Sequence, residues 1–390
     1  MRRSILKNGC FCYFNFNSLL KAKKEYYENG TVPWLLSGEV SQGEIWTATN
    51  YITQKGLENS SARIFPKDTV LVAMYGATAG QVGILRFEAA TNQAVCGILP
   101  NKNFIPEFLY YVLMSKKDEL VAQAAGNAQP NISQIKIKNT EIPLPPLPEQ
   151  QRIVAILDEA FEGIAIAKAN AEKNLQNARA LFESHLHAVF SQRGEGWVEK
   201  RLEQIGSTQT GSTPKSSEQG NYGDLIPFIK PADFNKDGSL DYENDGLSEQ
   251  GFRTARKISA NSVLMVCIGA TIGKCGWCDR DVTSNQQINA FTPVEGISSK
   301  FIYYQMLTED FQRRVIHFSG QATLPIINKS KWSALTVTLP PKFSDQEHIV
   351  DQLDALMIET QRLESIYQQK LSALDALKKS LLDQAFRGEL

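Results

Sequence analysis

The passage that decides the fold is Ile142-Pro-Leu-Pro-Pro-Leu-Pro-Glu-Gln-Gln-Arg-Ile-Val-Ala-Ile-Leu-Asp158, in which a proline-rich segment leads directly into a helical pattern. It recurs near the C-terminus as Thr338-Leu-Pro-Pro-Lys-Phe-Ser-Asp-Gln-Glu-His-Ile-Val-Asp-Gln-Leu-Asp354. Ile153-Val154 corresponds to Ile349-Val350, and Leu157-Asp158 corresponds to Leu353-Asp354. A long passage that recurs in the same order indicates a tandem duplication.

The duplication extends through the rest of the chain. Residues Asp68–Gly80 match Asn261–Gly273 without a gap, and an amphipathic helical pattern follows in each copy, near Phe108–Leu120 and Phe301–Val315. Short β-rich runs alternate with Gly, Asn, Ser and Asp turns before that helix. We therefore predict an α+β fold with two mixed α/β domains related by an internal repeat.

Each proline-rich passage opens a long helical pattern, at 143–192 and 341–390, and the predicted globular domains occupy 1–142 and 193–340. A helix of this length spans on the order of 60 Å. Antiparallel pairing is the simplest way to bury both seams, and it would place the domains at opposite ends of a rod. Apolar residues at steps of three and four residues predict coiled-coil seams: Ile153, Leu157, Ile164 and Leu181 in the first helix, and Ile349, Leu353, Leu356, Leu363, Leu374 and Leu381 in the second.

Length and composition point to a globular protein of at least two domains. The chain has 390 residues, 42% of them hydrophobic, and a formal net charge of -1. This length exceeds one ordinary core. The charge gives no general affinity for nucleic acid, so a DNA-binding face would need local clustering. The 6 cysteines lack regular spacing, which is typical of reduced thiols in a cytoplasmic protein. We expect neither a membrane helix nor a signal peptide.

With these features together, the chain resembles the specificity subunits of Type I restriction–modification systems. The resemblance covers almost everything from Lys21 to the end. It rests on Pro143–Gln150 followed by Arg152-Ile-Val154 and Leu157-Asp158, on Trp197 with Leu202, on Gly211-Ser-Thr-Pro214, on the two Gly-Ala-Thr-x-Gly loops and on Gln384-Ala-Phe-Arg-Gly388.

In that family each globular domain is a target recognition domain that reads one half of a split DNA sequence. The resemblance therefore implies a non-catalytic subunit that binds double-stranded DNA and docks two methyltransferase subunits as well as restriction subunits. It also implies that the paired helices set the gap between the half-sites. S-adenosylmethionine, ATP and Mg²⁺ would bind to the partner subunits only, so we expect no cofactor on this chain.

The first 20 or so residues depart from the pattern of the second copy. Where the second copy has Trp197, Leu202 and Gly211-Ser-Thr-Pro214, we align Arg3, Asn8 and Asn17-Ser-Leu-Leu20. The sequence leaves open whether the first domain still reads DNA.

Basic residues beside the repeat motifs are the candidates for DNA contact. Each could equally be a solvated surface charge, and a role in binding phosphate or bases comes mainly from the resemblance. The candidates are Lys21, Lys23, Lys24 and Arg63 in the first copy, and Lys215, Lys230, Arg256 and Lys257 in the second.

Several motifs favour structural roles. Gly269-Ala-Thr-Ile-Gly-Lys274 has the wrong glycine spacing for a phosphate loop, so Gly76, Thr78 and Gly80, like Gly269, Thr271 and Gly273, are predicted to form tight strand connections. Cys275 and Cys278 correspond to Val82 and Leu85, which predicts apolar packing and not a metal site. Asn92-Gln93 and Asn285-Gln286 could read adenine, but their presence in both copies favours structural hydrogen bonds.

Two other hypotheses stay open at this point. The chain could be a coiled-coil scaffold that binds only proteins, or a decayed specificity subunit with a disabled first domain. An enzyme is disfavoured because the sequence has neither a methyltransferase Asn/Asp-Pro-Pro-aromatic motif nor a complete phosphate loop. The sequence does not reveal the DNA target or the spacer length.

Overall fold

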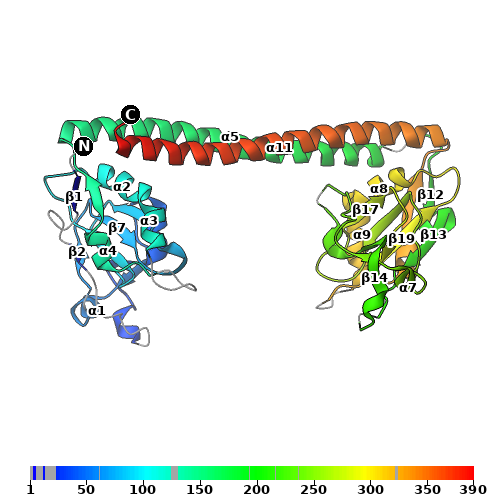
Figure 1. Cartoon of the computed structure of the whole chain (residues 1–390), viewed down its shortest axis with the longest axis horizontal. Coiled ribbons are helices and arrows are strands. Elements are labelled where there is room, and N and C mark those ends of the chain that lie inside the picture. The colour runs from blue at the N-terminus through cyan, green and yellow to red at the C-terminus, as the bar shows by residue number, and fades with distance from the viewer. Residues whose placement is uncertain are drawn as a thin grey trace. The chain divides into compact units, whose positions relative to one another are not determined.

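The computed structural model describes residues 3–5, 12–13, 23–60, 62–123, 131–192, 194–215, 217–235, 237–320 and 324–390. The chain divides into two compact units (Figure 1). Unit 1 comprises Met1–Asn170 and Lys370–Leu390, and unit 2 comprises Ala171–Gln369. Both long helices therefore contribute a segment to each unit. The division cuts through both long helices.

Unit 1 contains three sheets, with strand orders β1-β11, β2-β10-β7-β8-β4 and β5-β3-β9-β6. The strands are β1 (Arg3–Ile5), β2 (Cys12–Tyr13), β3 (Val32–Leu35), β4 (Glu44–Ile45), β5 (Asn50–Ile52), β6 (Ile64–Phe65), β7 (Val70–Ala73), β8 (Val82–Leu85), β9 (Ala89–Thr91), β10 (Val95–Ile98) and β11 (Glu141–Pro143). The helices are α1 (Gln54–Glu58), α2 (Pro106–Ser115), α3 (Lys117–Ala122), α4 (Gln134–Lys138) and the start of α5 (Leu147–Ser191).

Unit 2 has the sheet orders β12-β20, β13-β19-β16-β17 and β15-β14-β18. Its strands are β12 (Val198–Arg201), β13 (Gly206–Thr210), β14 (Tyr222–Ile229), β15 (Gly246–Leu247), β16 (Ser262–Val266), β17 (Cys275–Cys278), β18 (Thr283–Ser284), β19 (Ile288–Pro293) and β20 (Thr336–Leu339). Its helices are α6 (Leu202–Ile205), α7 (Glu249–Phe252), α8 (Ser299–Leu307), α9 (Glu309–Ser319), α10 (Lys329–Ser333) and the start of α11 (Phe343–Arg387).

The two sheet systems repeat each other, which confirms the predicted duplication and fold class. The order β2-β10-β7-β8 in unit 1 corresponds to β13-β19-β16-β17 in unit 2. The parallel pair β3 and β9 corresponds to the parallel pair β14 and β18. Helix α2 packs on β7 and β8 as α8 packs on β16 and β17.

The N-terminal segment supplies two paired strands, although the sequence marks it as atypical. β1 pairs with β11 as β12 pairs with β20, and Arg3 lies opposite Pro143 as Glu199 lies opposite Thr338. Counted from the equivalent helices α4 and α10, Pro143 corresponds to Thr338, so the two proline-rich passages align with a one-residue gap. Arg3 therefore takes the place of Glu199, and our sequence alignment of Arg3 with Trp197 is wrong by two residues. A short strand of changed composition carries too little pattern to fix its own register, which the pairing with β11 decides. Residues 14–22 lie outside the described part of the chain.

The long helices pair antiparallel within each unit. In unit 1, Arg152 donates to the Leu390 carbonyl at 2.8 Å and Lys168 pairs with Asp375 at 2.7 Å. In unit 2, Arg179 pairs with Glu364 at 2.9 Å. Buried seam residues include Ile153, Leu157, Ile164 and Leu353, while Ile349, Leu356, Leu363, Leu374 and Leu381 are partly buried.

Leu181 contradicts the seam prediction, since it is 56% exposed. Its neighbour Phe182 is buried instead and packs into the core of unit 2, with its ring 6.3 Å from that of Tyr304. Adjacent side chains of a helix point about 100° apart, and here the larger aromatic side chain takes the buried position.

Candidate nucleic-acid interface

In each unit the loops that follow two parallel strands meet at one edge of a sheet. β3 and β9 run in the same direction, so Leu36 and Asn92 follow them at the same edge. β14 and β18 bring Lys230 and Asn285 together in the same way. The Asn92 N–H donates to the Leu35 carbonyl at 3.0 Å, and the Asn285 N–H donates to that of Ile229 at 3.1 Å. Loops at the carboxyl ends of parallel strands commonly bind ligands.

A buried carboxylate fixes the loop beside this edge in both units. Glu39 accepts from the Leu36 N–H and from the Thr49 N–H, each at 2.8 Å. Asp233 accepts from the Lys230 N–H at 2.6 Å and from the Asn244 amide at 3.0 Å. Sequence reasoning missed this pair of carboxylates, although each stands four residues after an apolar residue that ends a strand.

The shared amides have the structural role that the sequence favours. The Asn92 side chain accepts from the Ala94 N–H at 3.1 Å, and that of Asn285 accepts from the Gln287 N–H at 3.0 Å. Gln286 accepts a hydrogen bond from Thr213. These hydrogen bonds fix the conformation of the loops. The residues common to both units therefore form a shared structural support for the loops, which we call the loop frame.

Arg256 also holds a loop of unit 2 in place. Its guanidinium donates to the Thr210 carbonyl at 2.8 Å, and its N–H donates to Ser212 Oγ at 3.0 Å. Gly211 lies between them, where a Cβ would stand 2.2 Å from the Asn285 carbonyl oxygen. The segment is therefore pressed against the edge, and Arg256 is exposed beside it.

The other basic candidates of unit 2 are paired with acids. Lys230 lies 2.7 Å from Asp245, and Lys257 lies 2.5 Å from Asp281. The Lys257 ammonium holds the pKa of Asp281 below its usual value. The Lys215 side chain is 81% exposed, and its Nζ lies 3.7 Å from a carboxylate oxygen of Glu218. Such surface pairs are weak enough for a phosphate to replace the acid.

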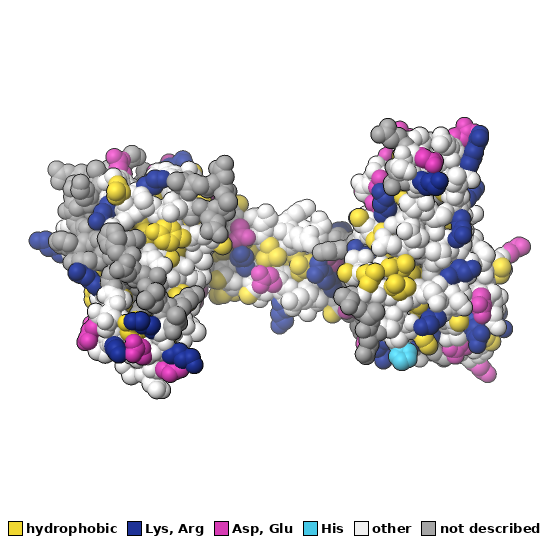
Figure 2. All heavy atoms as spheres, turned by 90° about the horizontal axis from the view of Figure 1, so that it is seen from below, with side chains coloured by type: hydrophobic (Ala, Val, Ile, Leu, Met, Phe, Trp, Pro, Cys, Tyr) yellow, Lys and Arg dark blue, Asp and Glu magenta, His cyan; other side chains and the backbone are white. Residues whose placement is uncertain are grey.

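Among the candidates of unit 1, Arg63 lies at the loop edge, because it directly precedes Ile64 of β6, which pairs with Ala90 near the carboxyl end of β9. Lys23 donates to Tyr26 Oη at 3.2 Å, Lys24 lies 3.9 Å from Glu28, and Arg63 is exposed next to β6. Lys21 falls outside the described residues. Basic side chains are scattered over the face that Figure 2 shows and do not form one dense patch. DNA contact by the basic candidates stays a prediction.

The two Gly-Ala-Thr-x-Gly loops make the tight strand connections that were predicted. Their glycines all have positive φ angles, 69° at Gly76, 79° at Gly80, 104° at Gly269 and 91° at Gly273. Only glycine adopts these angles readily. Thr78 donates to the Tyr75 carbonyl at 3.3 Å, and Thr271 is exposed.

Cys275 and Cys278 pack in the core, as predicted. They are 5% and 0% exposed, and burial raises the pKa of both thiols, that of Cys278 to about 11. The described residues include no group of His, Cys, Asp or Glu placed to hold a metal ion. No helix among them is long and apolar enough to cross a membrane.

The repeated residues of the long helices hold the globular part of each unit against its helix. Tyr111 donates to Asp158 and Tyr304 donates to Asp354, both at 2.5 Å. Burial raises the pKa of both phenols, and the adjacent carboxylates add to this effect. The tyrosines and aspartates recur in the sequence, but only the structure shows that they bond.

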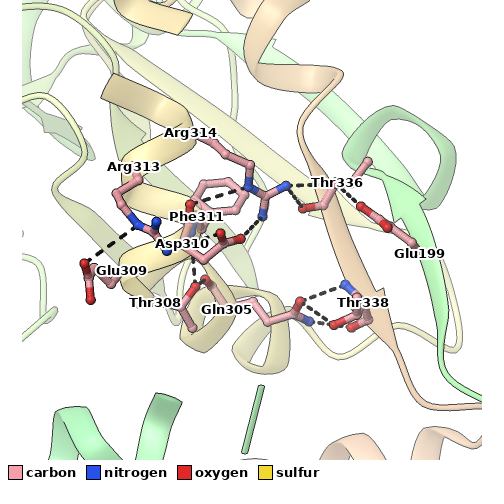
Figure 3. A network of polar contacts seen from close by, with 10 residues as sticks. All are labelled: Glu199, Gln305, Thr308, Glu309, Asp310, Phe311, Arg313, Arg314, Thr336 and Thr338. Atoms are coloured by element: carbon pink, nitrogen blue, oxygen red, sulfur yellow. Dashed lines mark hydrogen bonds and ion pairs between the residues drawn. The ribbon is translucent and has the colours of Figure 1, made fainter. Parts of the chain in front are cut away.

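A polar network covers the outer edge of β20 in unit 2 (Figure 3). The Gln305 amide donates to the Thr338 carbonyl at 2.6 Å and accepts from the Thr338 N–H at 2.8 Å. Arg314 donates to the Thr336 carbonyl at 3.0 Å. The network borders a cavity of about 530 Å³ beside the end of α5. A cavity of about 870 Å³ lies at the matching place in unit 1, beside the end of α11.

Comparisons with known proteins identify the family. The model of the Type I restriction modification DNA specificity domain matches twice, over residues 11–177 and 194–372. The StySPI specificity subunit of Salmonella potsdam is 24% identical over 94% of this chain and 84% of that subunit. The EcoR124I/EcoR124II specificity subunit of Escherichia coli is 26% identical over 36% of this chain, and the MjaIX specificity subunit of Methanocaldococcus jannaschii is 30% identical over 53% of it. The chain spans 36% and 52% of the lengths of these two relatives.

Solved structures share the fold. A chain reported with the structural basis of complex assembly and conformational transition of the type I R-M system has a TM-score of 0.81 at 21% identity, with coverage of 100% and 98%. The HsdS subunit from Thermoanaerobacter tengcongensis has a TM-score of 0.61 at 20% identity, with coverage of 100% and 97%. The family model and the curated relatives confirm the resemblance stated from sequence. Because the family model matches both units and most of the chain, this protein belongs to the Type I restriction–modification specificity family and carries its DNA specificity domain twice.

Proposed function

We propose that the protein is the non-catalytic, DNA-reading subunit of a Type I restriction–modification complex, in which each unit reads one half of a bipartite target. The observation that carries the proposal is the doubled specificity domain, with one loop frame in both units and different side chains on it. Glu39 and Asp233 hold equivalent loops, yet Leu36 stands where unit 2 has Lys230. A shared frame with different exposed residues suits two readers of different sequences.

The proposed partners are two methyltransferase subunits and the restriction subunits. S-adenosylmethionine, ATP and Mg²⁺ would bind to those partners. Several side chains of the long helices support docking, since Ile166 on α5 and Ile358 on α11 are 57% and 64% exposed and free to pack against other helices. The paired strands β1 and β2 favour an intact first domain over a decayed one.

A methylome tests the proposal. The chain is co-expressed with the neighbouring methyltransferase subunit in a host without adenine methylation, and modified bases are mapped by sequencing. We expect two short specific sequences around a fixed gap, with adenine methylated on both strands. Cells that carry the methyltransferase subunit alone are the control. A soluble complex that methylates no motif would refute the proposal and favour a protein scaffold.

A further inference from the structure

We propose that Trp46 contacts bases of the half-site read by unit 1 and is a specificity-determining residue there. This inference rests on the proposed DNA-reading function. Trp46 is 63% exposed, whereas Trp34 and Trp332 are buried and Trp197 and Trp277 are partly buried. Among the 5 tryptophans of the chain, Trp46 alone presents most of its indole to solvent.

The backbone that carries Trp46 is fixed on both sides. Ile45, directly before it, is 0% exposed and pairs with Leu85 of β8. Thr49, three residues later, donates its N–H to the buried carboxylate of Glu39. Asn50 then enters β5 opposite Trp34. A residue between two such anchors has little freedom to fold back, so the exposure of Trp46 is a property of the frame.

The same anchors place Trp46 in the candidate interface. Glu39 binds both the Leu36 N–H and the Thr49 N–H, so the Trp46 loop lies next to the residue that follows β3. Asn92, which follows the parallel strand β9, is bonded to Leu35 at that edge. Leu36 is itself 37% exposed. Trp46 and Leu36 are thus two exposed apolar side chains at the loop edge.

The equivalent loop of unit 2 has a different character. There the buried Asp233 takes the place of Glu39, Leu240 takes that of Ile45, and Asp241 stands where unit 1 has Trp46. Asp241 accepts from the Glu243 N–H at 3.0 Å. One unit thus offers an indole where the other offers a carboxylate, a difference that changes what each reads.

An indole suits base edges better than phosphates. It has no positive charge and a single N–H donor, so it neutralises no phosphate and releases no counterion. Its apolar face can pack against the C5-methyl group of thymine in the major groove. Losing such a contact should change base preference without changing the salt dependence of binding.

The test compares wild type, Trp46→Ala and Trp46→Phe as full chains in complex with the methyltransferase subunits. Val294→Ala is the matched control, since Val294 is 55% exposed but lies beyond Pro293, at the end of β19 away from the loop edge. The measurements are affinity for the motif-bearing duplex at several salt concentrations, the methylated motif and thermal unfolding.

For Trp46→Ala we expect specific affinity to fall about ten- to hundredfold, with the salt slope and the melting temperature unchanged. The motif should relax in one half only, Trp46→Phe should recover part of the affinity, and Val294→Ala should behave as wild type. Unchanged affinity and motif in Trp46→Ala would overturn the inference, as would relaxation of both halves or a changed salt slope. A wild-type complex that selects no sequence would instead overturn the proposed function on which the inference rests.

Discussion

Two fully buried glutamines show how single residues join the recognition domains to the long helices. Gln150 accepts from the Ile105 N–H at 3.0 Å and donates to the carbonyls of Asn103 and Pro145 at 2.9 Å. Gln346 accepts from the Ser298 N–H at 2.9 Å in unit 2. Each amide thus satisfies the backbone just before α2 or α8. Buried polar groups require such partners.

We predict that Gln150→Ala lowers the free energy of unfolding by about 1–3 kcal/mol, because the part-buried Ile105 N–H and the carbonyls of Asn103 and Pro145 lose their partner. Urea unfolding measures the change. Gln151→Ala is the matched control, since Gln151 is exposed on the same helix turn. Equal stability of the two variants would show that the bonds of Gln150 contribute nothing.

The buried thiols predict a loss of stability at alkaline pH. Burial raises the pKa of Cys267 to about 12 and that of Cys278 to about 11, and also raises that of Cys275. Below pH 9 these thiols are protonated in both the folded and the unfolded chain. Above pH 9 they ionise only in the unfolded chain, so stability falls as pH rises, by about 1.4 kcal/mol per pH unit for each thiol.

Urea midpoints between pH 7 and 10.5 test this effect. Above pH 9 the urea midpoint of Cys267→Ala should fall less steeply with pH than that of wild type. Below pH 9 the two midpoints should change in parallel. Identical slopes above pH 9 would mean that the Cys267 thiol ionises in the folded protein.

Among the elements, the edge strands β11 and β20 differ in how the backbone groups on their outer side are accommodated. In unit 2 the Gln305 amide satisfies both backbone groups of Thr338. In unit 1 Pro143 stands in place of Thr338 and has no N–H. The buried Val112, at the position of Gln305, lines the cavity of about 870 Å³ together with Pro143. Proline blunts an edge strand because it cannot donate. The polar pair Gln305–Thr338 and the apolar pair Val112–Pro143 are therefore alternative ways to leave no unsatisfied backbone group at this edge.

We predict that Gln305→Val destabilises unit 2 by about 1–3 kcal/mol, because the Thr338 N–H and carbonyl lose their partner. Adding Thr338→Pro should recover part of this loss, because the N–H is then absent and unit 1 shows that proline fits there. Unfolding of the two single variants and the double variant gives the coupling energy. Strictly additive effects of the two substitutions on the free energy of unfolding would show that the two pairs are not interchangeable.

The long helices show a contrast between sequence periodicity and packing. Leu157 is 0% exposed and packs with Ile153, Leu382 and Ala385, whereas Leu181 is 56% exposed. We predict that Leu157→Ala costs about 2–5 kcal/mol and that Leu181→Ala changes stability by less than about 0.5 kcal/mol. Thermal and urea unfolding of the isolated chain measure both. A large loss in Leu181→Ala would place that residue on a seam after all.

At the scale of the whole molecule, the two units have separate hydrophobic cores. The core of unit 1 gathers α2, β7 and the ends of α5 and α11 that belong to it, and the main core of unit 2 does the same with α8, β16 and the other ends. A change in one unit should therefore leave the packing of the other intact.

We predict that deletion of residues 1–13 weakens unit 1 alone. The deletion removes β1 and β2, and so leaves β11 and β10 without one partner strand each. Hydrogen exchange should accelerate in peptides of β10 and β11, while the matching strands β19 and β20 of unit 2 serve as the internal control. Unchanged exchange in β10 and β11 would show that these N-terminal strands add no protection.

The sequence by itself determined the duplication, the mixed α/β class, the two long helices and the structural nature of the Gly-Ala-Thr-x-Gly loops. These features depend on local periodicity, on glycine's backbone freedom and on repeated motifs, all of which can be read along one chain. Packing of Cys275 and Cys278 followed from their alignment with apolar residues of the other copy.

Only the tertiary structure decided which partner each side chain meets. In the folded protein Phe182 is buried in place of Leu181, and the Arg256 guanidinium donates to the Thr210 carbonyl. Lys257 forms an ion pair with Asp281, and pairing with β11 sets the register of β1. It also brought Glu39 to the loop that carries Trp46. These outcomes depend on groups that lie far apart in the sequence, and their distances are fixed only when sheets and helices pack together.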